Sequence, residues 1–260
     1  MKLKIQARLN YQAPEPCWVL AQFEAAETPV QVRQSNSLSI AGSPELTRLA
    51  AQDQIGERFW LQVNDRFSCT YEATVSVLRP AASIDGLRCS GLADLPANVV
   101  PYLLPSRYCS LHDFDPFIAA HLAGLQGGAL IAKVAEWLQG TFTYDIAASD
   151  AATTAADAYK MQRGVCRDYA HVLISIARAC SIPARYASVY APDVDPMDFH
   201  AVAEVYLEGQ WHLVDPTGMT TAERTAIIGV GRDATDVAFL TSFGDLRLVE
   251  QKVQVSEAIS

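Results

Sequence analysis

Residues 163–177 read RGVCRDYAHVLISIA, and this stretch decides the fold. Gly164 breaks regular structure, and the apolar residues after position 171 recur at the spacing of one buried helical face. The pattern predicts a helix over 166–180 with Cys166 in its first turn. The unpaired N–H groups and the positive end of the helix dipole stabilise a thiolate there. A lone free cysteine is more often a small buried side chain, so Cys166 needs partners before it is taken as a nucleophile.

A predicted hairpin supplies two candidate partners. Glu208-Gly209 separates two alternating stretches and suits a two-residue turn. With this turn, His200 and Asp215 are diagonal neighbours on one face, and His212 is on the opposite face. Diagonal neighbours have Cα atoms about 7–8 Å apart, within reach of an imidazole–carboxylate hydrogen bond.

The order Cys166, His200, Asp215 is that of a nucleophilic triad. An aspartate bound to one ring nitrogen fixes the histidine tautomer, and the other nitrogen can take the thiol proton. Taken alone, the hairpin pair is equally a surface histidine and an Asp-Pro turn that ends a strand. Together with a cysteine at a helix start, it predicts cysteine-dependent acyl transfer.

The chain divides into an N-terminal all-β domain, residues 1–85, and an α+β domain, residues 86–260. Period-two patterns dominate the first part, and helical periods begin after a proline-interrupted loop. The predicted strands are 2–10, 17–23, 59–63, 67–78, 185–190, 201–207, 210–214 and 246–255. The predicted helices are 116–125, 129–138, 153–161 and 166–180, with a short helix possible at 45–52.

Composition limits the class of protein. The 260 residues carry a net charge of −9, which argues against a nucleic-acid partner, since such proteins need a basic face. No stretch has the roughly 20 apolar residues of a membrane helix. The chain begins with an alternating strand pattern instead of a signal peptide. None of the six cysteines forms a C-x-x-C pair, so we expect a reduced, cytoplasmic protein with no cofactor and no metal.

The chain resembles the transglutaminase-like superfamily, specifically the bacterial branch whose members are named as cysteine proteases. The resemblance implies a papain-like core, in which an N-terminally capped helix bearing Cys166 packs on an antiparallel sheet bearing His200 and Asp215. It implies that these three act as nucleophile, general base and acid, and orienting carboxylate. The segments that carry the resemblance are 164–171, 181–186, 198–201 and 211–218, with 102–108 before them and 1–85 as the accessory domain.

Other residues near the triad are candidates for structural or supporting roles. Glu204 and Trp211 share the predicted face of His200, so Glu204 either orients the site or is an exposed strand glutamate. Asp168 favours the start of the cysteine helix, and the N–H of Cys166 is a candidate oxyanion donor. The acidic loop at 193–198 lacks the spacing of an EF-hand calcium site, so we expect it to shape the substrate cleft.

We expect a peptide or protein substrate, attacked by the thiolate to give a thioester. Water as acceptor gives a cysteine protease or amidase, and an amine gives a transglutaminase. The triad serves both reactions, and the family branch favours hydrolysis. A binding module with an idle site and a docking role for residues 1–85 are the remaining alternatives.

Overall fold

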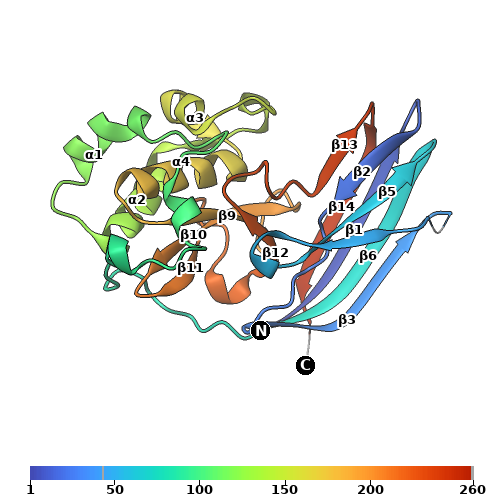
Figure 1. The fold of residues 1–260 in the computed structure, drawn as a ribbon, viewed down its shortest axis with the longest axis horizontal. Helices are drawn as coiled ribbons and strands as arrows, with labels where there is room; N and C mark the ends of the chain where they lie inside the picture. Colours follow the sequence, from blue (N-terminus) through green and yellow to red (C-terminus); the bar gives the residue numbers. More distant parts are fainter. Residues whose placement is uncertain (43, 259–260) are drawn as a thin grey trace.

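The computed structural model describes residues 1–42 and 44–258, which form two units lying side by side (Figure 1). One unit is a sandwich of two four-stranded antiparallel sheets. The other unit packs four α-helices around a third four-stranded antiparallel sheet. The expected α+β class, with a β domain beside a cysteine-bearing helix on an antiparallel sheet, is confirmed.

The sandwich buries one face of each sheet. Along β1 the odd-numbered residues, such as Ile5, are buried and their neighbours face solvent, which is the alternation that the sequence showed. Val19 and Phe59 of the second sheet meet them in one core. The first sheet has the order β14 (Arg247–Glu257), β1 (Lys2–Gln12), β6 (Arg66–Val77), β3 (Gln31–Ile40), and the second has the order β13 (Leu240–Phe243), β2 (Cys17–Ala21), β5 (Glu57–Val63), β4 (Thr47–Ala50).

The last two strands of the chain return to the sandwich. Strand β14 pairs with β1, and β13 pairs with β2, so residues 240–257 complete the two sheets that the N-terminal residues begin. The sequence analysis had placed this segment in the second domain. A strand's pattern shows which face is buried but not which distant strand completes its sheet, so the segment's position was not visible in the sequence.

Two elements of the sandwich differ from expectation. The helix predicted at 45–52 is wrong: β4 occupies Thr47–Ala50 and pairs with β5, and the short 3-10 helix η1 (Gln52–Gln54) follows. Pairing with β5 overrides the local preference of this segment. Strand β3 was missed because it is polar and mostly exposed on both faces, and therefore lacks a hydrophobic period.

In the second unit, the helix α4 is central. It packs against β9 and β10 and against the other helices, and it is buried from Asp168 to Arg178. Such burial on all sides is typical of a helix in the middle of a core. The helices are α1 (Asp115–His121), α2 (Gly127–Thr141), α3 (Ala155–Met161) and α4 (Cys166–Ala179), and the sheet has the order β11 (Gln210–Val214), β10 (His200–Leu207), β9 (Ala184–Tyr190), β12 (Ala226–Gly231).

The hairpin of β10 and β11 has the predicted register. Leu207 pairs with Gln210 across a two-residue turn. Glu208 and Gly209 have φ values of 48° and 81°, so both turn residues are left-handed, as in the tight turns that match strand twist. This register brings His200, the first residue of β10, beside Asp215, which directly follows β11.

A buried ion cluster joins the two units. The guanidinium of Arg185 on β9 lies 2.7 Å from Glu204 of β10 and 2.8 Å from Asp53 of η1 in the sandwich unit. Asp53 also accepts a hydrogen bond of 2.6 Å from the hydroxyl of Tyr102. The guanidinium stacks over Trp211, with 4.1 Å between Cζ and the ring centroid. One cation therefore holds a carboxylate from each unit.

Replacing Arg185 by leucine should destabilise the protein strongly. Because Asp53 and Glu204 would lose the counter-charge that they share while remaining largely buried, the free energy of unfolding should fall by about 3–5 kcal/mol. Urea unfolding measures this change. The matched control is Arg88→Leu, since Arg88 is 90% exposed and pairs loosely with Glu208 at 3.5 Å. Equal effects of the two substitutions would contradict the structural role of the cluster.

Candidate functional site

Cys166 is the first residue of α4, and contacts of Asp168 and Gly164 fix where this helix begins. The carboxylate of Asp168 accepts a hydrogen bond of 2.9 Å from the N–H of Val165 and caps the helix. A Cβ atom at position 164 would lie 2.6 Å from Asp168 Oδ2, so only glycine fits there. Asp168 itself is fully buried, whereas Cys166 is half-buried. The thiol thus lies at the positive end of the helix with access to solvent.

His200 and Asp215 meet as the hairpin register requires. His200 is the first residue of β10, and its Nε2 lies 3.0 Å from Oδ2 of Asp215, directly after β11. Three further donors hold this carboxylate: the N–H and hydroxyl of Thr217 at 2.9 and 2.7 Å, and the N–H of Thr220 at 3.0 Å. The two side chains are 0% and 3% exposed, so the pair is oriented and shielded from water.

The second ring nitrogen of His200, Nδ1, is not bonded to Asp215. Nδ1 is buried and has no hydrogen-bond partner within the described residues. Burial lowers the pKa of His200, but the hydrogen bond to Asp215 and the negative charges of Asp215 and Cys166 outweigh it and raise the pKa to about 10. Cys166 and His200 line one cavity of about 290 Å³. The structure therefore brings the three residues Cys166, His200 and Asp215 together.

Tyr144 is a neighbour of Cys166 that the sequence analysis left without a role. Its two-residue strand β7 (Thr143–Tyr144) pairs in parallel with β8 (Arg163–Gly164), which places Tyr144 opposite Gly164. Burial and the nearby Cys166 thiol raise the pKa of the Tyr144 phenol above its usual range. The phenol therefore keeps its proton beside the sulfur. A two-residue strand has no hydrophobic period, so no pattern in the sequence could have indicated this pairing.

Glu204 and Trp211 share a sheet face with His200, as expected, but lie in the cluster around Arg185. Neither lines the cavity beside Cys166. On the opposite face, His212 hydrogen-bonds through Nε2 to the carbonyl of Leu207 at 3.2 Å. His200 is the first residue of β10, whereas Glu204 lies in the middle of that strand and Trp211 lies near the start of β11. The side chains of Glu204 and Trp211 are therefore away from the thiol.

The acidic loop before His200 is tied to neighbouring strands and loops. Asp193 forms an ion pair with Arg224, with its oxygens 2.5 and 2.9 Å from the guanidinium nitrogens. Asp198 accepts hydrogen bonds of 2.7 and 3.0 Å from Gln251 of β14. The Asp198 contact fastens the loop to the sandwich, and the Asp193 contact ties it to the 3-10 helix η6 (Ala222–Arg224).

His171 lies beneath the cavity. The N–H of Ala234 donates to its Nε2 at 3.2 Å, and burial lowers the pKa of His171 to about 3. The ring is therefore neutral, with its proton on Nδ1. It packs between Tyr108 and Tyr186, with centroid distances of 5.0 and 5.3 Å. His171 thus supports the cavity wall and has no contact with Asp215.

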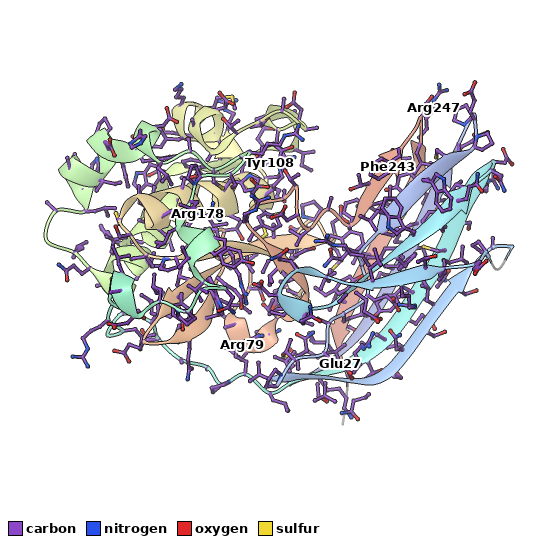
Figure 2. The ribbon with its side chains drawn as sticks, in the orientation of Figure 1. Glu27, Arg79, Tyr108, Arg178, Phe243 and Arg247 are labelled. Atoms are coloured by element: carbon purple, nitrogen blue, oxygen red, sulfur yellow. The ribbon has the colours of Figure 1, made fainter. Side chains whose placement is uncertain are left out.

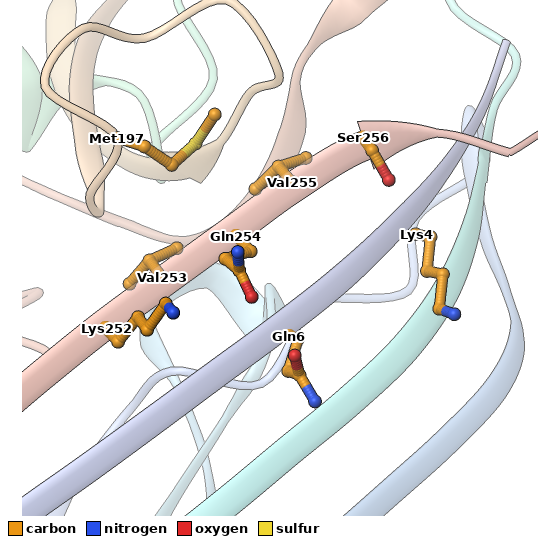
Figure 3. A pocket seen from close by; sticks show the side chains of 8 residues that line it. All are labelled: Lys4, Gln6, Met197, Lys252, Val253, Gln254, Val255 and Ser256. Atoms are coloured by element: carbon orange, nitrogen blue, oxygen red, sulfur yellow. The ribbon is translucent and has the colours of Figure 1, made fainter.

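A larger hollow, of about 600 Å³, lies away from the thiol, along β14 and β1 and beside Met197 (Figure 3). Its lining contains no cysteine, histidine or carboxylate. The residues shown there are Lys4, Gln6, Met197, Lys252, Val253, Gln254, Val255 and Ser256. Cys166 and His200 line the smaller cavity.

Residues 1–42 and 44–258 contain neither a candidate membrane-spanning helix nor a candidate metal-binding cluster. No helix in these ranges has the length and apolar character needed to cross a membrane. No three or more His, Cys, Asp or Glu side chains gather there in a way that could hold a metal ion.

Comparisons with known proteins identify similar sequences and folds. Residues 125–216 match the model of the transglutaminase-like superfamily. The uncharacterized protein ML0607 of Mycobacterium leprae is 32% identical over 117 residues, which are 42% of each chain, so the match spans less than half of that relative. The crystal structure of "a Putative Cysteine Protease" from Cytophaga hutchinsonii is 28% identical. It superposes with a TM-score of 0.92 over 100% of this chain and 91% of that chain, so both units share one arrangement with it.

The raised pKa of His200 predicts a pH-dependent stability. A group whose pKa is about 10 when folded and 6.5 when unfolded stabilises the fold fully below pH 6.5 and loses that contribution as the pH approaches 10. The stability gap between wild type and His200→Gln should therefore narrow from pH 6 to pH 9.5. Urea unfolding at several pH values measures it, with His212→Gln as the matched control. A stability gap that stays constant with pH would contradict the ion pair between His200 and Asp215.

Proposed function

We propose that the chain, whose residues 125–216 match the model of the transglutaminase-like superfamily, is a cysteine-dependent hydrolase of peptide or isopeptide amides. Cys166 is the nucleophile, His200 the general base and acid, and Asp215 the orienting carboxylate. The protease name of the similar Cytophaga hutchinsonii protein supports hydrolysis as the outcome.

One observation carries this proposal. His200 is hydrogen-bonded to Asp215 through Nε2, while its other nitrogen is unpartnered within the described residues and the ring shares a cavity with Cys166. A nucleophilic triad needs this arrangement, in which the carboxylate holds one ring nitrogen and the other nitrogen is available for the thiol proton.

The first half of the reaction forms a thioester. His200 takes the proton of Cys166, and the thiolate attacks the amide carbonyl carbon. The N–H of Cys166 at the helix start donates to the developing oxyanion, and the protonated Tyr144 phenol beside the sulfur is a second donor within this part of the site. The C–N bond then breaks as His200 returns its proton to the leaving amine.

The second half releases the acyl group. Water enters after the amine leaves, His200 removes a proton from it, and the resulting hydroxide attacks the thioester carbonyl. The C–S bond breaks, and His200 reprotonates the thiolate while the product leaves as a carboxylic acid. Asp215 holds the imidazole in one orientation through both halves and stabilises its cationic form.

Two other outcomes use the same scaffold. A primary amine in place of water gives transglutaminase chemistry with the same thioester. An idle site would leave a protein-binding module, but the buried and fully hydrogen-bonded carboxylate of Asp215 beside His200 favours a working one. All six cysteines are free thiols, which supports a reducing compartment such as the cytoplasm.

Substitution of the three residues should separate their roles. Cys166→Ala and His200→Ala should abolish hydrolysis of a fluorogenic peptide-amide library, and Asp215→Ala should lower kcat by up to about 10⁴-fold because the imidazole loses its orientation. Mass spectrometry of wild type with a slow substrate should show an acyl adduct on Cys166. Cys89→Ala, at an exposed cysteine outside the cavity, is the matched control.

Adding a labelled primary amine to the same assay shows whether water or an amine is the acyl acceptor. Release of free carboxylic acid supports hydrolysis, whereas dominant incorporation of the amine would replace it with transamidation. Turnover retained in Cys166→Ala would end the nucleophile assignment.

A further inference from the structure

The cavity beside Cys166 has apolar walls drawn from distant parts of the chain. Tyr108, Tyr186, Phe199 and Phe239 contribute aromatic rings, and four alanines and a valine contribute further apolar surface. None of the described residues that line it is an aspartate, glutamate or lysine. A substrate group that enters the cavity therefore meets mainly carbon atoms.

The guanidinium of Arg167 in the lining is already engaged. Arg167 donates to the hydroxyl of Ser149 at 2.8 Å and to the carbonyl of Asp150, and it lies 3.3 Å from the carboxylate of Asp168. The hydroxyl of Tyr108 likewise donates to a backbone carbonyl at 2.7 Å. The charge and this hydroxyl are thus used within the protein and are not available to bind a charged substrate group.

The walls are held in place before any substrate arrives. Phe239 stacks on Phe199 with 4.7 Å between centroids and an interplanar angle of 12°, and Phe199 in turn packs on Tyr190 at 5.5 Å. On the other side, His171 stacks on Tyr108 and accepts the hydrogen bond from the wall residue Ala234. A preformed apolar cavity favours binding because little ordering is required.

We propose that this cavity is a specificity pocket for a bulky apolar side chain on the acyl side of the scissile amide. The acyl group is the part that becomes bonded to Cys166, so its side chain lies nearest the cavity. A volume of about 290 Å³ suits one aromatic or branched side chain. Burying a charged side chain there without a partner is unfavourable. This inference rests on the proposed function and adds the class of substrate.

The test uses fluorogenic peptide amides that differ only in the acyl-side residue: Phe, Leu, Ala, Asp or Lys. For the full-length protein, kcat/KM should be about 10-fold to 200-fold higher for Phe and Leu than for Ala, the range typical of apolar pockets. Asp and Lys substrates should be the poorest. Equal values for all five would overturn the pocket assignment while leaving the proposed hydrolysis standing.

Two variants locate the preference in the cavity. Ala238 is exposed at the rim, so Ala238→Phe should fill the entrance and lower the Phe-to-Ala ratio of kcat/KM at least about 10-fold. Phe239→Ala should lower the same ratio by removing a wall. A ratio unchanged in both variants would overturn the proposal, provided that thermal unfolding shows both to be folded.

Phe243→Ala is the matched control. Phe243 is 60% exposed on the sandwich, four residues beyond Phe239 and outside the cavity lining, and Figure 2 shows it on the opposite unit from Tyr108. Its substitution should leave the ratio unchanged, and an equal loss there would contradict the assignment to the cavity. If wild type cleaves none of the amides and Cys166 forms no adduct, the proposed function itself fails, which is distinguishable from cleavage without preference.

Discussion

The packing of α4 against β9 and β10 is the constraint on which the site depends. Apolar side chains such as Leu173 and Ile176 bury this helix, and small residues such as Ala203 on the facing strand let it approach closely. Because the helix cannot shift without opening the core, its first turn has a fixed position. Cys166 is therefore presented at the helix start to the first residue of β10. The chemistry at one end of the helix follows from the burial of the rest.

Two buried charges, those of Asp215 and Arg185, are each compensated by several partners. Asp215 has four donors around its carboxylate, and Arg185 has a carboxylate from each unit. The first arrangement orients His200 and stabilises its protonated form. The second holds the sandwich against the sheet that carries His200. Both arrangements cost desolvation free energy, and each fixes the relative position of segments that are distant in the sequence.

Local patterns predicted the elements that position the triad. The helix over 166–180 and the register of the hairpin were visible because their apolar periods are short-range and their turn residues are distinctive. The pairing of β14 with β1 and the convergence of Tyr108, Phe199 and Phe239 on one cavity were not, since each depends on contacts between distant segments. The same reason explains why Glu204, on the expected face, belongs to the cluster between the units.

The most direct test of the central claim is site-resolved alkylation of the native protein with iodoacetamide from pH 4 to pH 9, with each cysteine quantified by mass spectrometry. The proposed thiolate–imidazolium pair of Cys166 and His200 predicts that Cys166 is alkylated faster than the exposed Cys89 well below neutral pH, and that His200→Ala removes this advantage. An inert Cys166, or a rate that is unaffected by His200→Ala, would contradict the account.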